Sequence, residues 1–213
     1  MKRPHAFAAT FLAVLVLVGS TAAATNGRPS TPVTIEASDP SQTEMAERAV
    51  DRFAQAGLKL PPLRIVFPGR DLSLCGGAQG RAYLSAEPVE VRMCWNSEFT
   101  LLHELAHVWE AFNMAASRHE PFMNMREGVA SWAGLGVAWE SRGREHAANV
   151  IGWGLLEDPH PISRTYPNDI ASMIEAFTFL TGRAPLHDGG EGIQHPDRTL
   201  FDGTASAPIR SGR

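Results

Sequence analysis

Residues 97–112 read SEFTLLHELAHVWEAF, and this stretch predicts a buried helix. Ser97 is a favourable N-cap residue, because its hydroxyl can accept a hydrogen bond from a backbone N–H of the first turn. Apolar residues surround most of the predicted helix: Leu101, Leu102, Leu105, Ala106, Val108, Trp109 and Phe112. A helix that is apolar on nearly all sides lies in a protein core. The ionisable side chains in its middle therefore need a chemical reason, since an unpaired polar group in a core is costly.

Those side chains are His103, Glu104 and His107, in the pattern HExxH. Positions i and i+4 of a helix share one face, so His103 and His107 can present two imidazole nitrogens to a single metal ion. Glu104 lies about 100° around the helix from His103, within reach of a water molecule on that metal. The pattern is typical of zinc hydrolases. We therefore expect Zn²⁺ at His103 and His107, with Glu104 as the catalytic residue.

A catalytic zinc ion usually has three protein ligands and one open position, so HExxH leaves one ligand to be found. Metzincins continue the pattern as HExxHxxGxxH, whereas Glu110 and Asn113 stand at the last two of those positions here, which excludes that class. The remaining common arrangement takes a glutamate from a later helix. Two residues qualify: Glu127, and Glu145, which opens a segment whose small residues would let a helix pack closely.

The order of a small β-region, the LLHELAHVW helix and a later glutamate helix resembles the gluzincin branch of zinc peptidases. More narrowly, the pattern RGxExAAxxIxWGL over 142–155 and the run AFTFLTGRAP over 176–185 resemble a group of actinobacterial exported proteins that carry the same HELAH helix. The ligand helix is similar to that of the antirepressor-cleaving ImmA-type peptidases. The resemblance covers roughly residues 75–185 and is most specific in HELAH. It implies a zincin-like fold with Glu145 as the third ligand and keeps Glu127, in its EGxA pattern, as the alternative.

The residues before the HExxH helix predict a helix and a small sheet. Ser41 and Glu44 form a capping-box pattern at the start of a helix over 41–56. Short apolar or alternating runs between Pro and Gly turn signals then predict three strands, over 63–67, 81–85 and 89–94.

The residues after the HExxH helix predict mainly helices. Apolar spacing indicates helices over 121–132, 142–156 and 168–181, and Asn168 can cap the last of them. We therefore expect an α+β, zincin-like fold in which a small three-stranded sheet is followed by a helical metal-binding core.

The N-terminus has the pattern of a cleaved signal peptide. Lys2 and Arg3 precede an apolar stretch over 6–18 and a small-residue cleavage site over 22–24. The apolar stretch is shorter than the roughly 20 residues that span a bilayer, so we expect no stable membrane anchor. The predicted organisation is a signal peptide over 1–24, a flexible linker over 25–40, a metallopeptidase domain over 41–182 and a low-order tail over 183–213.

The interpretation of the two cysteines depends on the predicted export of the protein. In a secreted or extracytoplasmic protein an even pair most simply forms a disulfide, so we expect a bond between Cys75 and Cys94. The two residues lack the CxxC spacing of a zinc site, and HExxH is the better metal nucleus.

The chain carries a formal net charge of −4 and shows no basic patch, so we expect no nucleic-acid partner. The predicted function is that of a secreted zinc metallopeptidase that hydrolyses peptide bonds in a peptide or protein substrate. The strand over 89–94 precedes the metal helix and is expected to pair with an extended substrate by β-augmentation. The alternatives are an exported zincin-fold binding protein without catalysis and a zinc amidase that acts on cell-wall peptides. No oligomeric state is predicted.

Overall fold

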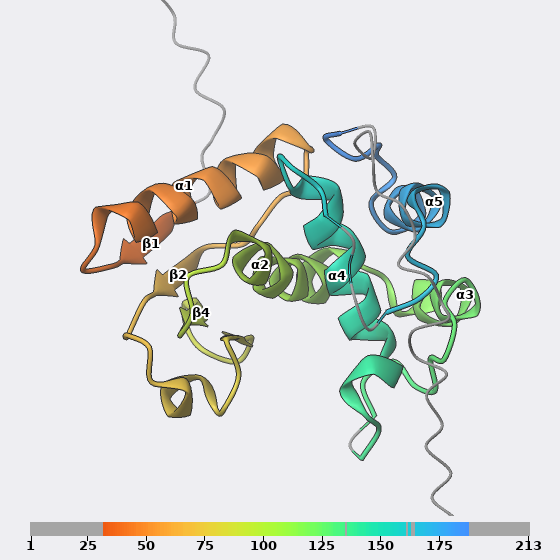
Figure 1. Ribbon diagram of the computed structural model, residues 1–213, viewed down its shortest axis with the longest axis horizontal. Helices are drawn as coiled ribbons and strands as arrows, with labels where there is room; N and C mark the ends of the chain where they lie inside the picture. Colours follow the sequence, from red (N-terminus) through yellow and green to blue (C-terminus); the bar gives the residue numbers. More distant parts are fainter. Residues whose placement is uncertain (1–31, 135, 161, 163–164, 188–213) are drawn as a thin grey trace, which may run out of the picture. The chain divides into compact units, whose positions relative to one another are not determined.

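The computed structural model describes residues 32–134, 136–160, 162 and 165–187 of the 213-residue chain. These residues form a small mixed four-stranded sheet and five α-helices, so the fold is α+β as predicted. In Figure 1, α2 lies between α1 and the strands on one side and α3, α4 and α5 on the other. The helices are α1 Pro40–Gln55, α2 Glu98–Asn113, α3 His119–Asn124, α4 Gly143–Leu155 and α5 Ile170–Thr181.

The sheet has the strand order β1-β2-β4-β3. Strands β1, β2 and β4 are parallel, and β3 runs antiparallel to β4. Alternate residues of β2 and β4 are buried in the same core as the helices, because one face of the sheet packs on that core. The strands are β1 Val33–Glu36, β2 Leu63–Val66, β3 Gly80–Tyr83 and β4 Val89–Met93.

Strand β1 corrects two predictions at once. It adds a fourth strand to the three expected, and it lies within 25–40, where a flexible linker was expected. Val33 and Ile35 pack against the core while Thr34 and Glu36 are exposed. This alternation of core-facing and exposed residues extends over only four residues. It is too short to be recognised as a strand among the surrounding Pro, Ser and Thr residues.

The predicted pairing of residues 89–94 with an extended substrate requires β4 to lie at an edge of the sheet, and this prediction is wrong. Strand β4 lies between β2 and β3 and pairs with both. Within the described residues, β3 is the edge strand on the side of the HExxH helix, because Gly80 of β3 lies against Thr100 and Glu104 of α2. The strand available for pairing with another chain at this edge is therefore β3.

The helix starts are set by aspartate or serine side chains. Ser97 caps α2 as predicted, and its Oγ accepts a hydrogen bond of 3.2 Å from the N–H of Thr100. Asp39 caps α1 in place of the Ser41–Glu44 box, because Pro40 has the fixed φ that favours the first helical position. Asp169 caps α5 instead of Asn168, which donates its side-chain amide to the carbonyl of Ile162.

Helices α2 and α4 form the central packed pair of the fold. A Cβ atom at Gly152 of α4 would lie 3.3 Å from the backbone nitrogen of His103 and 3.4 Å from the ring of Phe99. The missing side chain therefore allows a close approach of the two helices, as the small residues of this segment predicted. This contact brings the first turn of α4 alongside the HExxH residues of α2.

The predicted helix over 121–132 is mostly absent. Helix α3 ends at Asn124, and Gly128 then takes a φ of 72°, which favours glycine. The N–H of Glu127 donates to the carbonyl of Tyr166 at 2.8 Å, and the N–H of Ala130 donates to that of Ser141 at 2.9 Å. The backbone groups that would extend the helix are thus used in contacts with residues distant in the sequence.

Residues 183–187, assigned to a low-order tail, are packed on α4. The N–H of Leu186 donates to the carbonyl of Gly154 at 2.8 Å, and His187 bonds the carbonyl of Trp153 at the same distance. The predicted signal peptide and residues 188–213 of the predicted tail lie outside the described residues. None of the helices in the described part of the chain is long and apolar enough to cross a membrane.

A disulfide joins Cys75 to Cys94, as predicted. It links the 3-10 helix Leu72–Cys75 to the residue that follows β4. A disulfide suggests an extracytoplasmic environment, because reducing compartments keep cysteines as free thiols.

Removal of this disulfide should destabilise the fold. The bond closes a loop with a sequence separation of 19, for which chain-entropy estimates give about 3 kcal/mol. We expect the double variant Cys75→Ala/Cys94→Ala to lose roughly this free energy of unfolding in urea titrations. The wild-type protein in its reduced form is the matched control and should unfold like the variant. Equal stability of the oxidised protein and the variant would contradict the prediction.

Candidate metal centre

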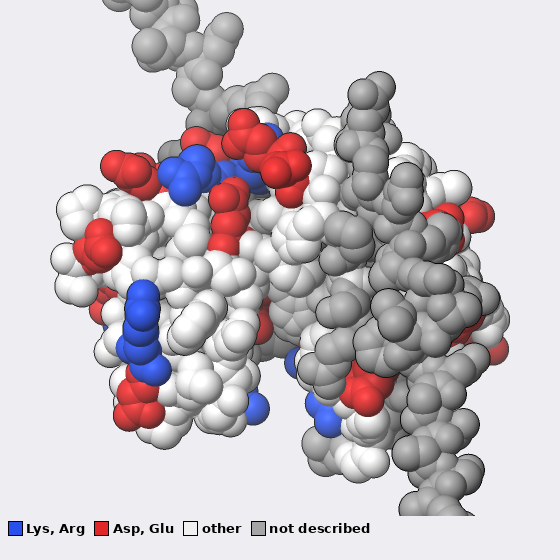
Figure 2. Space-filling view, in the orientation of Figure 1, with Lys and Arg blue, Asp and Glu red and all other residues white. Residues whose placement is uncertain are grey.

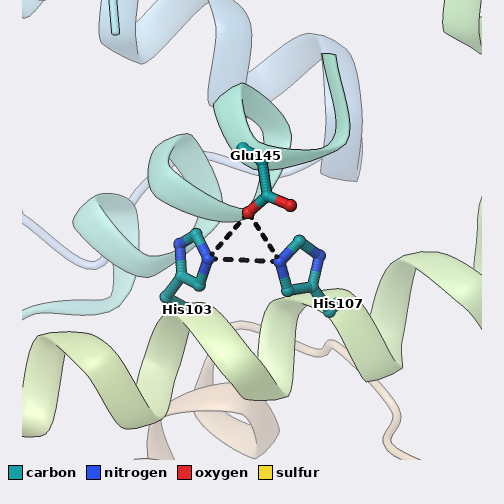
Figure 3. A group of neighbouring side chains, drawn as sticks. All are labelled: His103, His107 and Glu145. Atoms are coloured by element: carbon teal, nitrogen blue, oxygen red, sulfur yellow. Dashed lines mark hydrogen bonds and ion pairs between the residues drawn. The ribbon is translucent and has the colours of Figure 1, made fainter. Parts of the chain in front are cut away.

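Three side chains from α2 and α4 converge on one point (Figure 3). His103 and His107 point from the same face of α2, and their Nε2 atoms are 3.1 Å apart. Glu145, from the first turn of α4, places Oε2 3.2 Å from Nε2 of His103 and 3.1 Å from Nε2 of His107. All three residues are buried. This group could hold a metal ion.

The triangle of donor atoms has the size that a small divalent cation requires. Zinc ligands lie about 2.0–2.1 Å from the ion in a tetrahedral arrangement, which separates any two of them by about 3.3 Å. The three observed edges are 3.1, 3.1 and 3.2 Å. Two imidazoles and one carboxylate also form a donor set that zinc accepts in catalytic sites, with a fourth position left open.

The far side of the His103 ring is fixed by α4. Its Nδ1 atom lies 2.8 Å from Oδ1 of Asn149, and the amide of Asn149 in turn donates to Oγ1 of Thr165 at 3.2 Å. An amide oxygen only accepts hydrogen bonds, so the imidazole proton lies on Nδ1. In the neutral ring this leaves the lone pair on Nε2, which faces Nε2 of His107 and Oε2 of Glu145.

Carboxylates surround the second histidine. Oε2 of Glu110 lies 3.8 Å from Nδ1 of His107 and is buried, and no hydrogen-bond partner for it is found among the described residues. Burial alone would lower the pKa of His107, but the nearby carboxylates of Glu110, Glu145 and Glu104 raise it to about 9. Burial would raise the pKa of Glu145, yet His103 and His107 hold that pKa well below its usual range. The surroundings therefore favour positive charge at this point of the core.

Asn149 should contribute to metal affinity although it holds no metal itself. Loss of a partner that orients a ligating histidine typically costs 10–100-fold in affinity. We expect Asn149→Ala to weaken zinc binding by about that factor in competition with a chromophoric chelator. Asn149→Asp keeps an oxygen acceptor for Nδ1 of His103 and is the matched control. An Asn149→Ala variant with wild-type affinity would show that this hydrogen bond does not orient the ligand.

Glu104, the predicted catalytic residue, is not one of the three residues that could hold a metal ion. Its side chain is 8% exposed and turns toward the sheet, where Oε2 accepts a hydrogen bond of 2.9 Å from the N–H of Ala82 in β3. Because it neighbours His103 in the helix, it stands beside the metal group and on the side of the edge strand.

Glu127 lies outside this group of residues. It is exposed, and its backbone pairs with Tyr166 in an isolated bridge. The structure thus brings together His103, His107 and Glu145 and leaves out the alternative ligand.

Several residues that contact His103, or that contact its hydrogen-bond partner, were not predicted from the sequence. Asn149 lies four positions after Glu145, so both residues share one face of α4, and this spacing could have identified it. The ring of Trp139 stacks on that of His103 at 6.0 Å between centroids, and Thr165 contacts Asn149 from a loop. Nothing in the local sequence indicates these last two contacts.

His146, next to Glu145, fixes the start of α4. It is buried, lies 2.8 Å from the carbonyl of Glu140 through Nε2, and accepts a weak hydrogen bond from Nε of Arg126 at 3.5 Å. Burial lowers the pKa of His146, and the charge of Arg126 acts in the same direction. A neutral His146 therefore ties the first turn of α4 to the residues before it.

The sequence matches no protein-family model, and no curated protein and no solved structure is significantly similar to it.

Proposed function

We propose that this chain is a zinc-dependent hydrolase that cleaves peptide bonds. The observation that carries the proposal is the triangle of His103, His107 and Glu145 donors, with edges of 3.1–3.2 Å, next to the carboxylate of Glu104. His103, His107 and Glu145 would hold the ion. A bound zinc ion supplies a Lewis acid that lowers the pKa of water and polarises a carbonyl group.

Glu104 has the role of general base and acid in this proposal. Its carboxylate takes a proton from the attacking water and transfers it to the nitrogen of the leaving amine. A structural zinc site has no need for this acid, because four protein ligands close such a site. The buried carboxylate beside a three-ligand group therefore favours catalysis over a purely structural role.

The same arrangement supports a zincin-like fold of the gluzincin type. In that interpretation α2 is the helix of the two histidines, α4 is the glutamate helix, and the small sheet lies beside α2. The disulfide and the predicted signal peptide support secretion as the location of the activity.

An extended peptide is the substrate form that the sheet edge favours. The carbonyl group of the half-buried Ala82 faces away from β4, at the edge of β3, where it could accept a hydrogen bond from a docked chain. Figure 2 shows a recess in the surface between the end of the sheet and the segment that precedes α4, with Lys and Arg atoms on its walls. A peptide along β3 would pass beside Glu104 and the metal group.

The proposal is tested by incubating the zinc-loaded protein with a broad peptide library and identifying cleaved bonds by mass spectrometry. We expect cleavage that stops when a chelator is added, resumes with zinc, and is absent in His103→Ala. Zinc binding without cleavage of any peptide, cell-wall peptides included, would contradict the enzyme proposal and favour a binding protein.

A further inference from the structure

The free edge of β3 presents the N–H of Ala82 to α2. The pairs Arg81–Arg92 and Tyr83–Glu90 and the hydrogen bond from the N–H of Cys94 to the carbonyl of Gln79 fix the register of β3 on β4. In an antiparallel ladder alternate residues bond the neighbouring strand. Gln79, Arg81 and Tyr83 therefore face β4, and Ala82 points away from it.

The N–H of Ala82 is used by Glu104. It donates to Oε2 of that residue at 2.9 Å, and Glu104 is almost fully buried at this contact. A backbone donor within a paired strand has no rotamer freedom, so it fixes the position of its acceptor more firmly than a long side chain would. The hydrogen bond engages one oxygen, which leaves Oε1 to exchange a proton.

Gly80, two residues earlier, gives the stem of Glu104 its space. A Cβ atom at Gly80 would lie 2.9 Å from Cγ of Glu104, 3.1 Å from Sδ of Met93 and 3.1 Å from Cγ2 of Thr100. The backbone of Gly80 does not have the positive φ that requires glycine elsewhere in the chain. Glycine is needed here because the strand approaches α2 closely, beside the Glu104 side chain.

We propose that Gly80 and the backbone N–H of Ala82 are positioning groups for Glu104, so that the edge strand holds the general base in place. The kinetic part of this inference rests on the proposed hydrolase function, whereas the hydrogen bond itself does not. Proton transfer requires the base within hydrogen-bond reach of the water, and a displacement of about 1 Å can cost roughly 100-fold in rate.

Amide hydrogen exchange followed by NMR tests the contact without reference to activity. The Ala82 amide should exchange about 10- to 100-fold faster in Glu104→Ala than in the wild-type protein, and it should stay protected in Glu104→Gln, which keeps an acceptor. The Tyr83 amide faces β4 and is the internal control for the sheet. If the Ala82 amide exchanges equally fast in the wild type and in Glu104→Ala, or if Tyr83 loses protection together with it, the inference is overturned.

Kinetics then test what the contact does. Gly80→Ala should lower kcat for peptide cleavage by about 10- to 100-fold, with KM and zinc content unchanged. In a Glu104→Gln background the same substitution should cause no further loss of kcat, because Gly80 acts only through the general base and the general base is already absent. An equal loss in both backgrounds, or a loss of zinc, would overturn the inference.

The two proposals fail in different ways. If the wild-type protein cleaves no peptide, the proposed function fails and the exchange rate of the Ala82 amide alone decides the positioning contact. If Gly80→Ala does not fold, Glu104→Ala still decides it. If cleavage is normal in Gly80→Ala, the positioning role fails while the hydrolase function stands.

Discussion

Substitution of Glu104 by Gln should lower kcat for peptide hydrolysis by about 10²–10⁴-fold, which is the usual contribution of a general acid–base group. The zinc content should stay unchanged, because Glu104 is not among the three residues whose donors converge. Gln has nearly the same shape as Glu and can accept the hydrogen bond from Ala82, so the fold around the site should persist. Steady-state rates at fixed zinc loading, together with metal analysis, measure both effects.

Glu98→Gln is the matched control for this substitution. Glu98 lies in the first turn of the same helix and has the same charge, but it belongs to no metal group in the described residues. It should retain the wild-type rate. Retained turnover in Glu104→Gln would remove Glu104 from the mechanism.

Substitution of Glu145 by Ala should cause the largest loss of metal affinity. It removes one of the three side chains that could hold a metal ion and leaves two buried imidazoles whose Nε2 atoms are 3.1 Å apart. We expect zinc affinity to fall by more than about 100-fold, beyond the range seen when only a supporting partner of a ligand is lost. Competition with a chelator of known affinity measures the change.

Glu127→Ala is the control that separates the two glutamates predicted from the sequence. Glu127 is exposed and stands outside the ligand group, so this variant should bind zinc like the wild-type protein. The reverse result, with affinity lost in Glu127→Ala and kept in Glu145→Ala, would contradict the assignment of the third ligand.

The local part of the site could be predicted from the sequence, since it depends on helix geometry alone. Ser97 caps α2, and His103 and His107 lie on one face because they are four residues apart. Glu145 could not be chosen over Glu127 from residue spacing, because its position depends on the packing of α4 against α2 at Gly152. A resemblance to gluzincins favoured Glu145, and the convergence of its Oε2 on the two histidines agrees with that expectation.

The rest of the fold depends on contacts between distant residues. Strand β1 carries its pattern in only four residues, and β3 becomes the edge strand through a register that no local pattern defines. The helix expected over 121–132 ends early because the backbone of Glu127 pairs with that of Tyr166. The contact between Ala82 and Glu104 is of the same kind, since a backbone N–H has no sequence signature.

We propose that His103, His107 and Glu145 hold one metal ion. Anomalous diffraction from zinc-grown crystals, measured on both sides of the zinc absorption edge, tests it most directly. We expect one peak about 2 Å from Nε2 of His103, Nε2 of His107 and Oε2 of Glu145. A zinc-saturated crystal with no peak at that point, or with its zinc bound at Glu127 instead, would contradict it.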